Sequence, residues 1–304
     1  MQSNVELETF AAQLEASGEY RVLRRLHPRI EFNPENGSTK KMGIVLDVET
    51  TGLDYIRDEI IELAMVKFEF ASDGRIYRII DTFNQLREPS IPISEKVSAL
   101  TGITAEMVTG RTIDTQEVES FIDDAVIVIA HNADFDRKFC EQAWECFAAK
   151  AWACSMNEID WQAEGYEGLR LGYLLAGAGY FHDGHRASED CKALLELLVQ
   201  PLPVSKELAL RHLLDKARKP TSRIWAINSP YDQKDILKSR GYRWNDGGHG
   251  GPRAWWIDVA EEQTMEEKKF LCDNIYKGNF NFLWNKITAF NRYSIRINLE
   301  EVQR

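Results

Sequence analysis

Residues 42–46 and 125–130 are short, almost uninterrupted apolar segments, and each is followed within a few positions by acidic side chains. Continuous apolar runs of this length are typical of central strands that are buried on both faces. Such strands need helices above and below them to exclude water. The two segments therefore predict a layered α/β fold with polar side chains at one edge of its sheet.

The remaining periodicity gives an order of elements around these two strands. Residues 59–70 and 75–83 predict two more strands, joined by the turn Ala71-Ser-Asp-Gly74. Apolar spacing predicts helices at 94–100, 105–108, 115–123, 135–147, 169–178, 187–199 and 205–217. A three-strand meander followed by strands that alternate with helices predicts an α/β, ribonuclease H-like mixed β-sheet flanked by helices.

The two ends of the chain have a different composition. Residues 1–40 predict a helical arm, with an amphipathic helix and a second short helical piece at 20–26. Residues 204–304 contain five of the eight tryptophans and predict a smaller C-terminal α+β domain. We therefore expect three parts, with the arm at 1–40, the main domain at 41–203 and a basic, Trp-rich domain at 204–304.

Composition excludes some classes of protein. The longest apolar runs fall far short of the roughly 20 residues that a membrane span needs, and the first residues do not resemble a secretory signal. We expect a cytoplasmic protein without a membrane. Five scattered cysteines favour neither a disulfide framework nor a zinc site. The net charge of −11 disfavours a nucleic-acid partner without excluding one, because local charge can differ from the total.

Asp47 and Glu49 directly follow the first apolar segment. Residues two apart in a strand project to the same face, so both carboxylates would point into one site. Two buried like charges repel each other, and a divalent cation would remove that cost. The pair taken alone is explained equally well by a strand end whose acids face solvent.

Further polar groups begin two of the predicted helices. The sequence His131-Asn-Ala-Asp-Phe-Asp136 follows the second apolar strand, and His185-Arg-Ala-Ser-Glu-Asp190 opens the helix at 187–199. Each acid lies at or near the end of an element, where side chains meet at the edge of a sheet. A flexible Asp183-Gly184 segment precedes His185, which leaves its imidazole free to move over a bound substrate.

The motifs D-x-E-T-T-G-L, H-N-A-x-F-D and H-x-A-x-x-D, in this order, resemble those of the DEDDh 3′–5′ exonucleases. Within this family the sequence looks most like the proofreading (epsilon) subunit of bacterial DNA polymerase III and its stand-alone relatives. The resemblance covers residues 41–203. The segment 98–108 is also similar to the one that connects the first two motifs in that family.

The resemblance implies a role for each motif residue. Asp47, Glu49, Asp136 and Asp190 would bind two divalent cations, and their oxygen ligands favour Mg²⁺ or Mn²⁺. His185 would be the general base, since neutral imidazole suits proton removal near pH 7. Two cations would stabilise an in-line displacement that releases nucleoside 5′-monophosphates.

Two neighbouring residues compete with these assignments. Asp134 lies two residues before Asp136, and the family pattern favours Asp136 as the ligand because it follows the phenylalanine directly. Asp134 is predicted to be a helix N-cap. His182 competes with His185, but only His185 has the family's offset to Asp190, so His182 is predicted to lie in a surface loop.

The resemblance also indicates substrate contacts. Thr50, Thr51, Gly52 and Leu53 resemble the family's pocket for the terminal nucleotide, and a simple tight turn is the alternative. His131 and Asn132 are expected to position the loop or the substrate.

The C-terminal domain is a candidate for single-strand binding. Residues 205–256 contain eleven Lys and Arg but five Asp and Glu, and aromatic residues lie between them. Bases stack on rings while phosphates meet cations, which is how single strands are bound. The alternative is that the tryptophans form the core of a small domain. We consider this alternative stronger for Trp225 and Trp256, and equal for Trp244 and Trp255.

The sequence thus predicts a DNA 3′–5′ exonuclease in proofreading or repair, with single-stranded DNA or frayed 3′ ends as its partner. An RNA 3′–5′ exoribonuclease is the alternative, because the distinction depends on how the pocket treats the 2′-hydroxyl. A non-catalytic adaptor with the same fold is a third hypothesis, which the intact motifs argue against. No recognisable peptide supports binding to a polymerase or a sliding clamp, and nothing in the sequence supports a homodimer.

Overall fold

The structure is a computed structural model that describes residues 4–248, 250–278 and 283–296. Its centre is a five-stranded sheet with the strand order β4-β3-β2-β5-β6. The strands are β2 (Lys40–Thr50), β3 (Ile60–Ala71), β4 (Ile76–Leu86), β5 (Ala125–Ala130) and β6 (Trp152–Cys154). β2, β3 and β4 form an antiparallel meander, whereas β5 and β6 run parallel to β2. The predicted ribonuclease H-like mixed sheet is confirmed.

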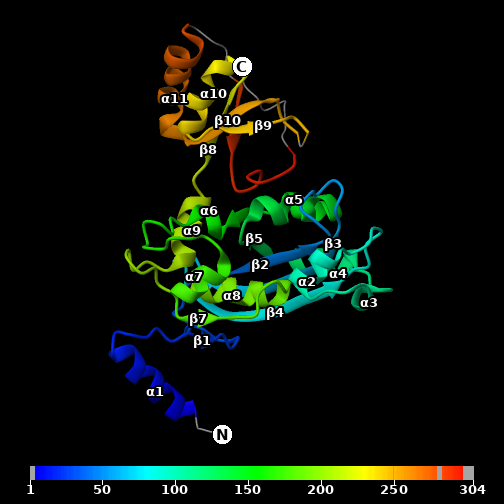
Figure 1. The fold of residues 1–304 in the computed structure, drawn as a ribbon, viewed down its shortest axis with the longest axis vertical. Helices are drawn as coiled ribbons and strands as arrows, with labels where there is room; N and C mark the ends of the chain where they lie inside the picture. Colours follow the sequence, from blue (N-terminus) through cyan, green and yellow to red (C-terminus); the bar gives the residue numbers. More distant parts are fainter. Residues whose placement is uncertain (1–3, 249, 279–282, 297–304) are drawn as a thin grey trace.

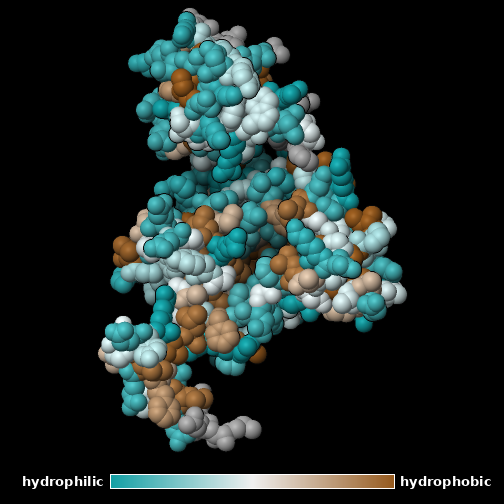
Figure 2. All heavy atoms as spheres, viewed as in Figure 1, coloured by the Kyte–Doolittle hydropathy of each residue, from teal (hydrophilic) through white to brown (hydrophobic). Residues whose placement is uncertain are grey.

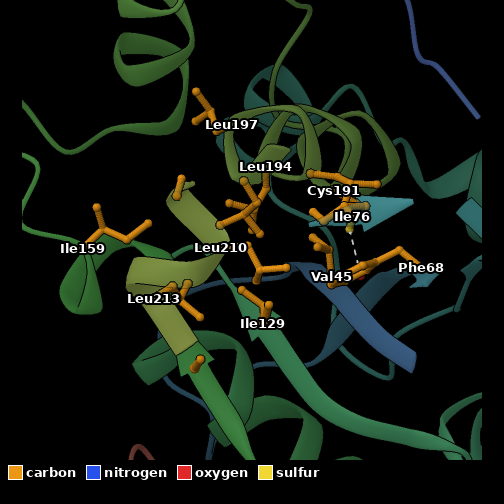
Figure 3. Close-up of a cluster of buried hydrophobic side chains, with 14 of the residues drawn as sticks. Val45, Phe68, Ile76, Ile129, Ile159, Cys191, Leu194, Leu197, Leu210 and Leu213 are labelled. Atoms are coloured by element: carbon orange, nitrogen blue, oxygen red, sulfur yellow. Dashed lines mark hydrogen bonds between the residues drawn. The ribbon is translucent and has the colours of Figure 1, made fainter. Parts of the chain in front are cut away.

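Helices cover both faces of this sheet (Figure 1). One face packs against α7 (Leu171–Gly177), α8 (Ala187–Val199) and α9 (Ala209–Ala217). Figure 3 shows Cys191 and Leu194 of α8 directed toward the strand residue Val45. Both strands predicted from continuous apolar runs are buried on their two faces, as the absence of alternation indicates.

The other face packs against α4 (Thr115–Ile122) and α5 (Ala133–Ala143). The short helices α2 (Glu95–Thr101), α3 (Ala105–Val108) and α6 (Ser155–Glu158) lie in the connections. The helix expected at 135–147 is instead α5 followed by a 3₁₀ turn at Glu145–Ala149, and the helix expected at 205–217 begins at Ala209.

In the described part of the N-terminal arm, from residue 4 onward, α1 (Asn4–Ala16) is the single helix. The second helical piece expected at 20–26 is wrong, because this segment is extended and β1 (Arg24–Arg25) pairs in parallel with β7 (Tyr180–Phe181). The sequence could not show that a partner strand from far along the chain would satisfy these backbone groups. Apolar side chains gather on α1, at the bottom of Figure 2, and Phe10 remains 51% exposed.

The C-terminal part forms a second sheet with the order β11-β8-β10-β9. Its strands are β8 (Thr221–Ala226), β9 (Arg243–Asn245), β10 (Ala254–Ala260) and β11 (Leu283–Ile287), all antiparallel to their neighbours. Helices α10 (Lys234–Ser239) and α11 (Thr264–Phe270) cover one face around Leu237 and Ile224. The predicted smaller α+β unit is therefore present.

The described residues contain no helix that is long and apolar enough to cross a membrane.

Candidate active site

Asp47 and Glu49 lie at the end of β2, where the strand is irregular between Glu49 and Thr50. Both side chains are half-buried and project from the same face of the strand, as the spacing predicts. Carboxylate oxygens of Asp47, Glu49 and Asp190 all lie within 4.8 Å of one another. The structure therefore brings residues from β2 and α8 together that are more than 140 positions apart in the chain.

Asp136 lies in the first turn of α5 and is 2% exposed. Its Oδ1 accepts a hydrogen bond of 3.2 Å from the backbone N–H of Val48, which lies between Asp47 and Glu49. Asp134, by contrast, is exposed and pairs with Lys138 at 3.0 Å. Of the two aspartates, Asp136 is therefore the one that faces β2.

The prediction that Asp134 is the N-cap of this helix is wrong. The helix begins at Ala133, and the N-cap is Asn132, with a left-handed φ of 77°. The turn after β5 is tighter than the sequence suggests, so Asp134 already lies inside the helix. Acidic residues in a first turn still interact favourably with the helix dipole.

Asp190 lies near the start of α8, and both of its oxygens have partners. Nε2 of His182 lies 2.6 Å from Oδ1, and the backbone N–H of His185 donates to Oδ2 at 2.9 Å. The His182 side chain is only 7% exposed, so the prediction of a surface-loop residue is wrong. The chain folds back between His182 and Asp190, which sequence offset alone could not show.

The His185 side chain is exposed, and its backbone adopts a left-handed φ of 65°. A positive φ is uncommon for a residue other than glycine. Here it accompanies the hydrogen bond from the N–H of His185 to Asp190. The expected mobility of the exposed imidazole stays a prediction.

Glu62 lies beside these carboxylates, and the sequence did not point to it. It is fully buried in β3 and lies opposite Glu49 in the register of the two strands. Its carboxylate accepts a two-pronged hydrogen bond from the Arg186 guanidinium, at 3.2 and 3.0 Å, and a third from the N–H of Ala187. Glu62 thus fixes the start of α8, and with it His185 and Asp190. Its signal was the one acid within the apolar residues 60–66 of β3.

Burial and repulsion by neighbouring carboxylates raise the pKa of Asp47, Glu49 and Asp136. Burial raises the pKa of Glu49 to about 8, with additional contributions from Asp190 and Glu62. The pKa of Asp47 lies well above its usual range for the same reason, with Asp136 as the strongest charged neighbour. Burial also raises the pKa of Asp136, against the hydrogen bond from Val48. Strongly raised carboxyl pKa values are typical of functional sites.

Thr51 and Gly52 form a tight turn around Asp58. The hydroxyl of Thr51 donates to the Asp58 carboxylate at 3.3 Å and accepts from the N–H of Glu59 at 2.9 Å. A Cβ atom at position 52 would meet the Asp58 carboxylate at 2.4 Å, so any larger residue would displace this carboxylate from its hydrogen bonds.

Thr50 and Leu53 complete this segment. The Thr50 hydroxyl donates to the carbonyl of Gly52 at 2.5 Å, whereas the Leu53 side chain is 86% exposed. Three of the four predicted pocket residues thus support a turn that presents an exposed apolar side chain next to the carboxylates.

His131 connects two loops. Its Nδ1 lies 2.8 Å from the hydroxyl of Ser155, and its Nε2 lies 2.7 Å from the carbonyl of Leu169. Burial lowers the pKa of His131, so the ring favours the neutral form. Asn132 is exposed beside it. The expected role of His131 and Asn132 in positioning the loop or the substrate stays a prediction.

The carboxylate group fits divalent cations. It offers only oxygen atoms, which Mg²⁺ and Mn²⁺ prefer, and its spacing of 4.8 Å or less allows two or three carboxylates to share one ion. The raised pKa values of Asp47 and Glu49 show that these carboxyls lack sufficient positive partners within the protein itself. A bound cation would supply the missing charge.

Residues 44–198, just over half of the chain, match the RNase T family, which is described as Exonuclease. The chain therefore belongs to this exonuclease family. The matched range contains Asp47, Glu49, Asp136, His185 and Asp190.

The relatives include two bacterial polymerases. The chain is 31% identical over 174 residues to the DNA polymerase III PolC-type of Caldanaerobacter subterraneus subsp. tengcongensis. It is 32% identical over 187 residues to the protein of the same name from Thermotoga maritima. These matches cover 55% and 56% of this chain but only 12% of each relative, so the chain corresponds to a small part of those proteins.

Solved structures are also similar. Exonuclease X in complex with a 5′ overhanging duplex DNA is 23% identical, with a TM-score of 0.41, over 56% of this chain and 99% of that one. Exonuclease I of E. coli in a complex with single-stranded DNA is 13% identical, with a TM-score of 0.49, over 77% of this chain and 71% of that one.

Proposed function

We propose that this protein is a metal-dependent 3′–5′ exonuclease that shortens DNA from its 3′ end and releases nucleoside 5′-monophosphates. The observation that carries the proposal is the convergence of Asp47, Glu49 and Asp190 within 4.8 Å, in a chain of the exonuclease family. Asp136 contacts the same strand, and the backbone N–H of the exposed His185 donates to Asp190. An adaptor would not need this costly group of carboxylates.

We assign the four acids to two divalent cations, Mg²⁺ or Mn²⁺. Asp47, Glu49 and Asp190, whose carboxylate oxygens lie within 4.8 Å of one another, would hold the cations together with Asp136, which contacts the backbone between Asp47 and Glu49. When bound, the cations would stabilise the charge that develops on the phosphate during an in-line displacement. Burial on β2 and α5 holds Asp47 and Asp136 in place before any substrate arrives.

His185 acts as the general base in this proposal. A ring nitrogen removes a proton from water as the water oxygen attacks the terminal phosphorus and the bond to the 3′-oxygen breaks. The 3′-oxygen leaves with a proton from solvent, which gives a 5′-monophosphate and a strand shortened by one nucleotide. Glu62 and Arg186 position His185 by fixing the start of α8. General base catalysis of this kind contributes about 10²–10⁴-fold in rate.

DNA is the proposed substrate because the relatives with 31–32% identity are DNA polymerases. The same relatives suggest a role in proofreading, and repair of frayed 3′ ends is consistent with the same reaction. RNA is the alternative substrate of the same site, since the difference depends on the 2′-hydroxyl of the terminal nucleotide.

The test uses 5′-labelled single-stranded DNA, mismatched duplex DNA and RNA of equal length, with Mg²⁺, Mn²⁺ or EDTA. We expect a ladder of products that shorten from the 3′ end of DNA, and no products with EDTA or with Asp47→Asn. Activity that survives EDTA would exclude the metal mechanism. Faster hydrolysis of RNA than of DNA would establish the alternative.

We also propose that residues 204–304 bind the single strand that leads to the active site. Trp244 supports this, because it is 49% exposed on the edge strand β9 and its ring lies 5.6 Å from that of Trp255. Trp225 is 1% exposed and donates to Asn285, so it belongs to the core of this domain. Trp256 lies under Arg223, whose Cζ is 3.9 Å from the ring centroid. Trp244 is therefore the tryptophan in this domain that is best placed for stacking on a base.

A further inference from the structure

Residues 288–296 form a segment that we call the C-terminal strap. It follows β11 and descends from the second sheet toward α5 (the red segment in Figure 1). The backbone N–H of Trp152 in β6 donates to the carbonyl of Ala289 at 2.8 Å. The strap thus covers the β6 edge of the main sheet, although more than 130 residues separate the two segments.

Arg137 is the residue of α5 that receives the strap. Its side chain is 0% exposed, and it directly follows Asp136 in the sequence. Its guanidinium donates to the strap carbonyls of Ala289 at 3.2 Å, Arg292 at 2.8 Å and Phe290 at 2.6 Å. Nε donates to Glu141 at 2.7 Å. Three of these four acceptors therefore belong to the strap.

Glu141, one turn further along α5, completes the connection. It is 5% exposed, and its second oxygen accepts from the Ser294 hydroxyl at 2.7 Å and from the N–H of Ile295 at 3.2 Å. The strap thus satisfies a buried cation and a buried anion of one helix. Removing the strap groups that pair with Arg137 and Glu141 would strongly destabilise the protein, because an uncompensated charge would then remain buried.

A second buried pair anchors the strap to α6 and α9. Arg292 is 7% exposed and donates to Glu158 at 2.6 Å, as well as to the carbonyls of Ala217 and Lys219. Ala217 is the last residue of α9, so the guanidinium also satisfies the end of that helix. The strap is therefore held at two buried points, and it connects α5 with the helix that leads into the second sheet.

We propose that the C-terminal strap is part of the support of the active site, and that Arg137 is a positioning residue that uses the strap to hold Asp136. The proposal rests on the proposed function, in which Asp136 is a metal ligand. The position of the Asp136 carboxylate depends on the rotation and tilt of α5. The sheet holds one side of this helix through Phe139 and Cys140, and the strap holds the side of Arg137.

This geometry explains why Arg137 is an arginine. Its planar guanidinium reaches four acceptors in different directions, whereas a lysine ammonium has three donors on a single atom. The carbonyls of residues 289, 290 and 292 curve around the guanidinium, so a lysine would leave buried acceptors without a donor. We therefore expect Arg137→Lys to loosen α5 while keeping the charge.

The experiment compares Arg137→Lys with Arg296→Lys, which makes the same change at an exposed arginine of the strap. The full-length proteins are tested for kcat and KM on single-stranded DNA, and Mn²⁺ binding is measured separately by titration calorimetry without DNA. We expect Arg137→Lys to lower kcat and to weaken Mn²⁺ binding, each by about 10–100-fold, as is usual when the support of a metal ligand is lost. The KM of Arg137→Lys should change little. The Arg296→Lys variant should keep the wild-type kcat, KM and Mn²⁺ affinity.

Ser294→Ala is the second variant, because it removes one donor to Glu141 and leaves Arg137 paired. Ser294→Ala should lower kcat and Mn²⁺ affinity by a smaller factor than Arg137→Lys. If Arg137→Lys does not fold, Ser294→Ala alone tests whether the strap supports the active site. If the folded variants keep the wild-type kcat and Mn²⁺ affinity and lose only thermal stability, the strap is merely structural and the proposal is refuted.

Failure of the proposed function would look different. In that case the wild-type protein would hydrolyse neither DNA nor RNA with either cation. The strap proposal alone would be refuted by a different set of results. In that set the wild type is active, Asp47→Asn is inactive, and Arg137→Lys has the same kcat and Mn²⁺ affinity as its control Arg296→Lys.

Discussion

Replacing Glu49 by glutamine should stabilise the metal-free protein while it abolishes activity. Glu49 is held next to Asp190 and opposite Glu62, and burial raises its pKa to about 8. An ionised Glu49 is therefore unfavourable in the folded protein when no cation is bound. Glutamine has nearly the same shape and carries no charge, so it removes the repulsion and keeps the packing.

The pKa determines both the sign and the size of this effect. The ordinary pKa of Glu49 is 4.5, so between pH 4.5 and 8 the folded protein binds more protons at this site than the unfolded chain does. Stability must then fall as the pH rises through this window. At 1.36 kcal/mol per pH unit the whole window corresponds to at most about 5 kcal/mol. Partial exposure to solvent reduces this to about 2–3 kcal/mol.

The assay is thermal unfolding in EDTA at several pH values from 5 to 8.5. Wild type should lose stability toward high pH, and Glu49→Gln should unfold about 5–10 °C higher than wild type at pH 8. The two curves should converge near pH 4.5. Saturating Mg²⁺ should stabilise wild type more than the variant, because the cation binds the carboxylates of the folded state only.

Glu62→Gln is the matched control, since Glu62 lies directly opposite on β3. The same substitution there removes the charge that Arg186 pairs with, and because the Arg186 side chain is partly exposed it should destabilise the protein by about 1.5–3 kcal/mol. A gain in stability for Glu49→Gln and a loss for Glu62→Gln would confirm that the site is crowded with negative charge. A Glu49→Gln variant that is no more stable than wild type at pH 8 in EDTA would refute the reasoning.

Three other predictions concern catalysis and binding. His185→Ala should lower kcat by about 10²–10⁴-fold with little change in KM, and a pH–rate profile that retains the wild-type acidic limb would contradict its role as the base. His182→Ala, which removes the neighbour of Asp190, should lower kcat less than His185→Ala, and an equal loss would mean that both imidazoles act on the reaction. Trp244→Ala should weaken binding of long single-stranded DNA by about 1–3 kcal/mol in a filter or fluorescence assay. Its hydrolysis of a trinucleotide should match that of wild type. The control variant Met265→Ala, at an exposed residue of α11, should bind long single-stranded DNA as wild type does.

Periodicity predicted the main sheet and most of its helices because burial on two faces leaves a strong local pattern. The residues at 125–130 and 187–199 form the expected strand and helix. The expected helix at 20–26 failed for the opposite reason, since its extended form depends on hydrogen bonds to residues 179 and 181. Local propensity cannot reveal a partner that lies about 155 residues away.

The candidate site divides in the same way. The motif spacing identified Asp47, Glu49, Asp136, His185 and Asp190 as candidates before any contact was known. The motif spacing could not identify the residues that hold these side chains in place. Two residues joined by a buried hydrogen bond can be separated by any number of positions in the sequence.

What the sequence determined by itself was therefore the type of sheet, the order of its elements and the chemistry of the acids at its edge. These follow from apolar periodicity and from residue type, which are local properties of the chain. Only the tertiary structure decided that Glu62 holds Arg186, that His182 rather than solvent faces Asp190, and that the strap surrounds Arg137. Each of these contacts joins segments that are distant in the chain or that a loop brings back together. Their energies depend on burial, which exists only once the chain has folded.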